Sequence, residues 1–336
     1  MQRRKFNERC ARDCSFEMNV IQLKRQSWNL AIILLALVLG LWRISQLPQF
    51  GAYEARTFVL GILPIALLSM GQAIIIIGGG INLAIGAEAV LINCLSAKYM
   101  QDTTFIESVI LAIVFILVGM LIGALTGWII AVSGIADIVV TLATSFLLVG
   151  VAMYVMPQPG GGVNQQFADL VSGKVPNFIP PLICLILPII LIWIPLYRSK
   201  LGISMYAIGS SKEAAFLSGV NVKLTKIKLY AIGGLFAGLS GLVLTGITLS
   251  SSPFANISNT ATLNSVAGAV LGGVALSGGV GGLVGPALAA LILYFIPTIL
   301  LAYGIDPAYS QIITGALTIF VVLLGGLLRK RTAGKK

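Results

Sequence analysis

The sequence predicts an all-α polytopic membrane protein with about ten transmembrane helices. Of its 336 residues, 57% are hydrophobic and only 10% are charged, whereas soluble domains carry roughly a quarter charged residues. The mean hydropathy is +0.99, and long apolar runs recur along the chain. These runs do not alternate apolar with polar residues, and backbone groups in lipid must bond within the protein. Helices are therefore expected rather than a β-barrel.

Ten apolar segments follow one another, and each predicts one helix. They lie at residues 28–47, 58–77, 84–97, 105–132, 138–156, 180–197, 229–249, 266–276, 283–303 and 310–328. The first is interpreted as a retained helix, because no A-x-A-like cleavage site follows it. Two segments, 84–97 and 266–276, are shorter than the roughly 20 residues that a helix needs to cross a bilayer.

Each short segment adjoins a glycine cluster. The clusters read "GGGINLAIG" (78–86) and "LSGGVGGLVG" (276–285). Short, Gly-interrupted segments are typical of broken helices beside a transport pathway, but small residues also let helix backbones approach closely. The sequence leaves both interpretations open here. Two other stretches, "GMLIGALTG" (119–127) and "GGLFAG" (233–238), are interpreted as packing motifs.

The basic residues predict the orientation in the membrane. With ten spans and a cytoplasmic N-terminus, 18 of the 22 Lys and Arg residues lie on the cytoplasmic side, as the positive-inside rule expects. The chain then consists of a cytoplasmic basic N-terminal segment (1–27), one transmembrane domain (28–328) with a cytoplasmic loop (198–228), and a cytoplasmic basic tail (329–336). The net charge of +11 reflects this orientation and contact with anionic lipid, not nucleic acid.

The chain lacks His and the motifs that are typical of catalytic and metal sites. It contains no His, the commonest metal ligand and general base, and Cys10 and Cys14 have no nearby partners for zinc. It also has no G-x-x-x-x-G-K-[ST] phosphate loop. We therefore expect no catalytic residue, no metal site and no cofactor in this chain, and a membrane enzyme is the least favoured class.

One stretch of the 198–228 loop predicts a short capped helix. Ser210 and Glu213 have the S-x-x-E spacing of a capping box, and Gly219 can end the helix in a left-handed cap. The helix would be about two turns long, with an exposed tip at Phe216 and Leu217. Such a helix is marginal alone, so it either docks into a groove of a partner or lies at the lipid interface.

This loop carries a resemblance to a known family. Residues 206–246, "YAIGSSKEAAFLSGVNVKLTKIKLYAIGGLFAGLSGLVLTG", resemble the cytoplasmic loop and next helix of ribose-type ABC sugar-importer permeases, whose pattern is similar to YAIGGNxxAAxLSGINV. Three further stretches agree in order and spacing: "IIIIGGGINLAIGAEAVL" (74–91), "IVVTLAT" (138–144) and "NSVAGAVLGGVALSGGVGGLVGPALAALIL" (264–293). The resemblance covers about residues 55 to 328.

The resemblance implies a type II ABC importer-like fold and a bacterial plasma-membrane permease subunit for a monosaccharide, most readily a pentose. It implies two ABC ATPase subunits that bind ATP and Mg, a second permease copy or paralogue, and an external solute-binding protein. A nucleoside, a sugar alcohol or a furanosyl signal molecule stays open as substrate. A stand-alone secondary transporter or channel stays open as a different class of protein.

The resemblance also makes the short helix a coupling helix, which ATPase closure moves. The candidate ATPase contacts are Lys212, Glu213, Ala214, Ala215, Phe216, Leu217 and Gly219. The chain departs from the family at the glycine clusters, because Asn82 and Val280 stand where an acid and an Arg are usual. Asn264 likewise stands where an Asp is common, so two acids and one base are replaced by neutral residues.

Uncharged sugars need a pathway of amides, hydroxyls and aromatic edges, without strong fixed charge. The candidate pathway or gate residues are Gly79, Gly80, Asn82, Glu88, Asn93, Thr141, Thr144, Gly278 and Gly279. The Ser-, Asn- and Thr-rich stretch 250–264 is expected to be external and would also suit such a pathway. A charged side chain at mid-bilayer costs at least about 2.5 kcal/mol. Glu88 is therefore functional, or a protonated group packed between helices, or a group close enough to the interface to be hydrated. Asp137, at a predicted helix boundary, is interpreted as an N-cap.

Overall fold

The computed structural model describes residues 30, 32–47 and 49–305, together with residues 308, 309, 312, 313, 315, 316 and 319. Within these residues the named elements are all helices, and one isolated β-bridge joins Gly160 to Ser251. The basic segments 1–27 and 329–336 lie outside the described residues, and only single residues of the predicted helix 310–328 are described.

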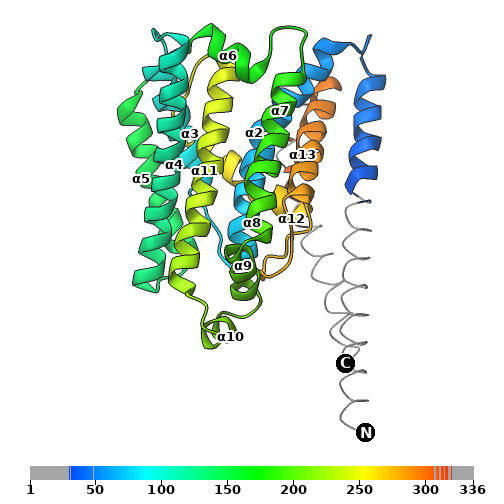
Figure 1. The fold of residues 1–336 in the computed structure, drawn as a ribbon. Helices are drawn as coiled ribbons and strands as arrows, with labels where there is room; N and C mark the ends of the chain where they lie inside the picture. The colour runs from blue at the N-terminus through cyan, green and yellow to red at the C-terminus, as the bar shows by residue number, and fades with distance from the viewer. Residues whose placement is uncertain are drawn as a thin grey trace.

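The chain forms a bundle of helices (Figure 1). A first helix, Ile32–Ser45, precedes the labelled ones. The labelled helices are α2 (Ala52–Ile77), α3 (Ile85–Tyr99), α4 (Phe105–Ser133), α5 (Asp137–Val155), α6 (Gln165–Ser172), α7 (Ile179–Pro188), α8 (Ile194–Arg198), α9 (Lys200–Ser210), α10 (Lys212–Leu217), α11 (Val222–Thr248), α12 (Ala255–Leu271) and α13 (Val284–Ala302). A π-helical turn, Ile189–Trp193, joins α7 to α8.

Six helical stretches in the described residues are long and apolar enough to cross a membrane. They are Ala52–Ile77, Phe105–Ser133, Asp137–Val155, Ile179–Arg198, Val222–Thr248 and Val284–Ala302. The prediction of a polytopic helical membrane protein is therefore confirmed. The helix predicted at 229–249 begins earlier, at Val222, because Asn221 caps it by accepting a hydrogen bond from the Leu224 N–H.

The two short helices differ in how well the sequence located them. α3 agrees with the predicted segment 84–97, but α12 spans Ala255–Leu271 instead of 266–276. The stretch 250–264, expected to be external, is therefore helical from residue 255. Some of its polar groups are hydrogen-bonded inside the bundle. The Thr262 hydroxyl accepts a hydrogen bond from the Gly86 N–H at 3.1 Å and lies 3.4 Å from the carbonyl oxygen of Leu83, a pairing that a hydropathy pattern does not report.

α11 packs along α4 through facing glycines. A Cβ on Gly119 would lie 2.7 Å from the carbonyl oxygen of Gly234, and one on Gly127 would lie 2.8 Å from the Cβ of Tyr230. Small residues at this spacing bring two helix backbones together. The packing interpretation of the stretches 119–127 and 233–238 is thus confirmed.

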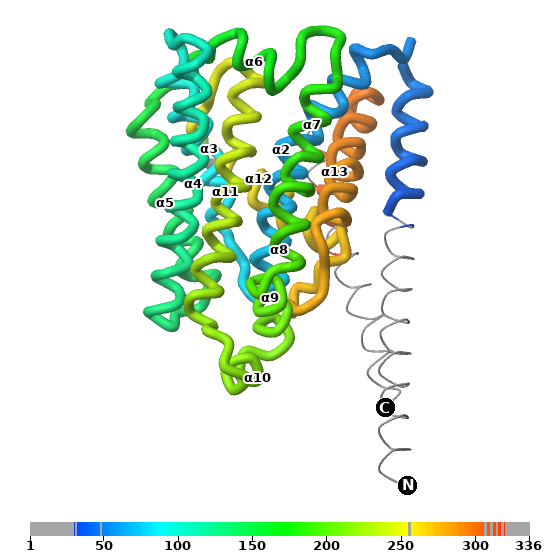
Figure 2. The backbone as a smooth tube through the Cα atoms, viewed as in Figure 1, coloured from blue at the N-terminus to red at the C-terminus, as the bar shows by residue number. Residues whose placement is uncertain are grey.

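The two ends of the bundle are different. α6 and the neighbouring loops lie at one end, whereas α9 and α10 lie at the other, and α10 projects beyond the remaining helices (Figure 1). Figure 2 shows the chain between α2 and α3 running from the α9 end of the bundle toward its middle before α3 begins. The α2–α3 segment (78–84) is therefore a break that enters the bundle next to the loop carrying α10.

Candidate functional site

α10 is a short helix fixed at both ends. The Ser211 hydroxyl accepts a hydrogen bond from the Ala214 N–H at 3.3 Å. At the other end, Gly219 has a φ of 82°, and its N–H and that of Val220 bond to the carbonyl oxygens of Phe216 and Ala215. This pair of bonds is a Schellman cap, so the predicted left-handed end is confirmed.

The predicted start of this helix is wrong by one residue. Ser210 is the last residue of α9, and its hydroxyl donates to the Tyr206 carbonyl oxygen within that helix. Ser211, in an extended conformation, is the residue that caps α10. Ser210 cannot cap α10 because α9 continues through it. The sequence has two adjacent serines here and does not show which of them caps the helix.

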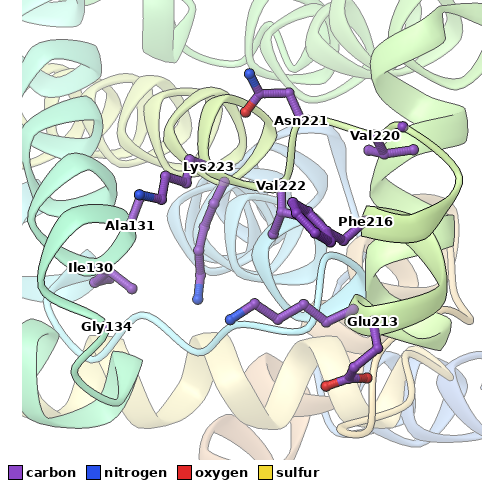
Figure 3. A pocket seen from close by; sticks show the side chains of 12 residues that line it. Ile130, Ala131, Gly134, Glu213, Phe216, Val220, Asn221, Val222 and Lys223 are labelled. Carbon is purple, nitrogen blue, oxygen red and sulfur yellow. The ribbon is translucent and has the colours of Figure 1, made fainter.

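The tip of α10 is exposed as expected. The side chains of Phe216 and Leu217 are 69% and 84% exposed, whereas Ala215 is buried. Behind the helix lies a cavity of about 620 Å³ between α10, the start of α11 and the end of α4. Figure 3 shows Lys223 extending into this cavity. Glu213 and Lys212 also line it, so an apolar tip stands beside a cavity with several charges.

The incoming arm of this loop, the end of α9, touches both glycine clusters. A Cβ on Gly209 would collide with the carbonyl oxygen of Ile77 and with the backbone of Gly279. The Gly279 N–H donates a hydrogen bond to the same Ile77 oxygen at 2.9 Å. Gly278, with a φ of 80°, packs against Gly209 and Gly79. The glycine clusters therefore meet each other at the base of the α10 loop.

The outgoing arm, the start of α11, touches the same break. Tyr230 Oη lies 3.2 Å from the Ile81 carbonyl oxygen and 2.9 Å from Asp137 Oδ2. Lys226 Nζ pairs with Asp137 Oδ1 at 2.6 Å. The N-cap interpretation of Asp137 is wrong, because Ala136 occupies the cap position and the Asp137 side chain turns toward α11. The sequence gives one indication of this cluster, because Lys226 and Tyr230 are four residues apart and so share a face of their helix.

Inside the break, Asn82 organises its own backbone. Its side-chain oxygen accepts a hydrogen bond from the Ala84 N–H at 2.8 Å, at the start of α3. The Gln72 amide, in the orientation that satisfies both groups, bonds to the backbone oxygen and nitrogen of Asn82 at 3.1 and 3.2 Å. Both side chains are buried. The neutral side-chain amide of Asn82 thus stabilises the bend before α3. The ribose-type permeases that the sequence resembles usually have an acid at this position.

Asn93 belongs to a different cluster, between α3 and α11. Its amide donates to the Thr245 hydroxyl at 2.8 Å, and its oxygen accepts a hydrogen bond from Ser251. The Ser251 hydroxyl also lies 3.2 Å from the Cys94 sulfur. With its polar atoms paired and its side chain buried, Asn93 has the contacts of a structural hydrogen-bonding residue.

Thr141 and Thr144 bond mainly to their own helix. The Thr141 hydroxyl donates to the Asp137 carbonyl oxygen at 2.8 Å, and the Thr144 hydroxyl to that of Val140 at 2.9 Å. Thr141 is buried and lies 3.5 Å from the Ile81 carbonyl oxygen. Of the two, only Thr141 is thus placed at the α2–α3 break.

Glu88 is buried between helices, with 1% of its side chain exposed. A Cβ on Gly234 of α11 would lie 2.7 Å from Glu88 Oε1, so the carboxyl occupies the space that the α4–α11 glycines leave open. Oε1 has no hydrogen-bond partner among the described residues. The structure thus places the predicted gate residue at the contact of α3 with α11.

A second cavity, of about 460 Å³, lies between four helices. Its lining comes from α2, α3, α11 and α12 and comprises Pro64, Ile65, Leu68, Gly86, Ala89, Val90, Ser240, Leu244, Ile257, Thr260, Ala261 and Asn264. None of the nine pathway candidates named singly is in this set, but Ile257, Thr260, Ala261 and Asn264 belong to the stretch 250–264, which the sequence indicated as suited to such a pathway. Sequence reasoning missed the lining residues of α2, α3 and α11 because each of these helices contributes only two or three of them. Asn264 is one of the neutral departures from the family pattern.

The fold and these sites define a class of membrane transport protein, and family membership follows from the sequence comparison. Residues 55–322 match the model of the family described as "Branched-chain amino acid transport system / permease component". The match covers most of the chain, so the chain belongs to this family of permease components. The resemblance to ribose-type ABC permeases is thereby confirmed.

Curated relatives are similar over most of their length. The chain is 31% identical to the probable ABC transporter permease protein y4mJ of Sinorhizobium fredii, over 90% of this chain and 89% of that protein. It is 30% identical to the ribose import permease protein RbsC of Bacillus subtilis, over 80% and 82%. It is 28% identical to the D-allose transport system permease protein AlsC of Escherichia coli, over 79% and 80%. No solved structure matches the chain significantly.

Proposed function

We propose that this chain is the membrane-spanning subunit of an ATP-driven ABC importer that carries a monosaccharide, pentose-like in size, delivered by an external binding protein. Relatives named for the import of ribose and D-allose support a sugar substrate. In this proposal two separate ATPase subunits bind ATP and Mg, and this chain binds no cofactor. A second permease copy or a paralogue completes the membrane part.

The observation that carries the proposal is the geometry of α10. A capped helix with an exposed aromatic tip is the form that docks into a groove of a partner. Both arms of its loop contact the α2–α3 break, through Gly209 and through Tyr230. Motion of α10 therefore has a direct mechanical route to the interior of the bundle, as ATP-driven transport requires.

The cavity between α2, α3, α11 and α12 supports a solute pathway for an uncharged molecule. Its wall is largely apolar, with hydroxyl and amide groups from Ser240, Thr260 and Asn264, a composition typical of small-molecule sites. We propose that the solute passes this cavity. Charged residues are absent from its lining, which suits a monosaccharide.

The proposed topology has about ten spans, with both termini and the α10 loop in the cytoplasm of a bacterial inner membrane. α3 and α12 would each complete a crossing together with the non-helical segment before them. The domain division into 1–27, 28–328 and 329–336 is part of this proposal. The distribution of basic residues along the sequence supports it.

The double variant Phe216→Ala with Glu213→Ala tests the proposal. Truncating an aromatic anchor in a docking groove commonly costs about 2 kcal/mol or more of binding free energy. We expect normal membrane insertion, weakened recovery of the ATPase with the tagged permease, and uncoupled ATP hydrolysis. Normal ATPase recovery together with normal uptake would reject the proposal. Uptake that instead follows lipid composition, with unchanged ATPase recovery, would indicate a helix lying on the lipid.

A further inference from the structure

Three side chains converge at the point where α11 leaves the α10 loop. Asp137 Oδ1 pairs with Lys226 Nζ at 2.6 Å, and Asp137 Oδ2 lies 2.9 Å from Tyr230 Oη. Lys226 and Tyr230 are four residues apart on α11 and so share one face of the helix. Each oxygen of the carboxylate thus has its own partner on that face.

The cluster fits closely against the backbone of the α2–α3 break. A Cβ on Gly80 would lie 2.6 Å from Asp137 Oδ2 and 2.9 Å from Tyr230 Oη. Tyr230 Oη also lies 3.2 Å from the Ile81 carbonyl oxygen. The side chains of Lys226 and Asp137 are only 19% and 15% exposed. A pair this enclosed is held in one geometry, unlike an exposed surface pair.

The same cluster faces the cavity behind α10, because Lys226 is part of its lining. The neighbouring Lys223 and Lys228 form no ion pair within the described residues. Of these lysines at the start of α11, Lys226 is the one that forms an ion pair with α5, through Asp137. Asp137 in turn contacts the α2–α3 break. Lys226 thus contacts Asp137 from the cavity side, and Asp137 together with Tyr230 contacts the segment that precedes α3.

We propose that Asp137, Lys226 and Tyr230 are positioning residues for transport. They hold the α2–α3 break against the start of α11, so that a displacement of α10 is passed to the segment preceding α3. The inference rests on the proposed function, in which an ATPase moves α10. It goes beyond that function by naming the residues that transmit the motion and the segment that receives it.

The test measures motion at two places in the complete complex of permease and co-expressed ATPase, in lipid nanodiscs. In a background without the native cysteines, a single cysteine replaces either Leu83, half-buried in the break, or Leu217, on the exposed tip. The rate of maleimide modification is compared with and without Mg–ATP plus vanadate. In the parent, both rates should respond to the nucleotide.

Asp137→Asn and Tyr230→Phe should separate the two responses. The response at Leu217→Cys should persist, while the response at Leu83→Cys should shrink by at least about fivefold, the lower end of typical coupling between sites. Exchanging the charges, Asp137→Lys with Lys226→Asp, should restore part of the response at Leu83→Cys. The matched controls Lys228→Met and Tyr154→Phe should leave both responses at the parent level.

The outcomes are distinguishable. An unchanged response at Leu83→Cys in both Asp137→Asn and Tyr230→Phe would overturn the inference. A loss of both responses together with a lower unfolding temperature would overturn it too, because it would indicate a purely structural cluster. No nucleotide response at Leu217→Cys in the parent, with no ATPase recovered, would instead reject the proposed function itself.

Discussion

The N–H of Gly279 donates a hydrogen bond to the carbonyl oxygen of Ile77, 2.9 Å away. Ile77 ends α2, whereas Gly279 lies between α12 and α13, so this bond joins two breaks that are far apart in the sequence. Gly209, at the end of α9, packs against both residues. The two breaks and the incoming arm of the α10 loop therefore form one contact region.

Gly209→Ala should destabilise this region. The added methyl group would overlap the Ile77 carbonyl oxygen, and overpacking of this kind typically costs about 1–3 kcal/mol of unfolding free energy. Thermal unfolding in detergent should show a lower midpoint. Gly150→Ala is the control, because nothing lies within 4 Å of its Cβ position. Equal midpoints for the two variants would contradict the close approach at Gly209.

Ser211→Ala should weaken α10, whereas Ser210→Ala should not. Ser211 caps the helix, and losing such a cap costs roughly 1 kcal/mol. Ser210 bonds only within α9. Recovery of the ATPase with the tagged permease should fall for Ser211→Ala alone. A larger loss with Ser210→Ala would mean that the capping box predicted from the sequence, and not the observed one, forms in the complex.

Glu88→Gln should be tolerated better than Glu88→Leu. The amide keeps the shape and hydrogen-bonding capacity of a neutral carboxyl, whereas Leu removes both beside the α4–α11 glycines. We expect near-normal uptake for the Gln variant and reduced yield for the Leu variant. If Glu88→Gln inserts normally but abolishes uptake, the charge itself is required, and a proton- or cation-coupled transporter becomes the better description.

Thr260→Phe should obstruct the cavity between α2, α3, α11 and α12. Thr260 lines this cavity and is exposed, so a larger side chain can be accommodated without repacking the core. Solute uptake should fall while ATPase recovery stays normal. Leu263→Phe, on the exposed part of the same helix and outside the cavity lining, is the control. Unimpaired uptake in Thr260→Phe would remove the cavity from the pathway.

Cysteines at positions 200, 223 and 333 should react only from the cytoplasmic side. The asymmetric distribution of Lys and Arg underlies this expectation. Lys174→Cys, near α6 at the opposite end of the bundle, should react with an impermeant reagent in intact cells and serves as the positive control. Labelling of position 223 under the same conditions would show that the topology is inverted.

Local sequence accounts for the features that depend on one segment. Apolar runs such as 105–132 became helices within a residue or two of their predicted ends, because backbone groups in lipid can be satisfied within a helix. The glycine at position 219 likewise ended α10 as expected. α12 was misplaced because its first half is rich in Ser, Thr and Asn, which lowers the hydropathy of the segment, although Thr262 pairs with α3 inside the bundle.

The sequence by itself thus determined the helical membrane architecture, the family and the exposed α10, since each follows from periodicity or motif within a short window. Only the tertiary structure decided which residues meet. It brought Lys226 to Asp137, 89 positions away, and turned an expected helix cap into one half of an ion pair. It also set Glu88 against Gly234 of α11. The physical reason is that helix packing determines which side chains meet. The packing of any one helix depends on residues that lie far from it in the sequence.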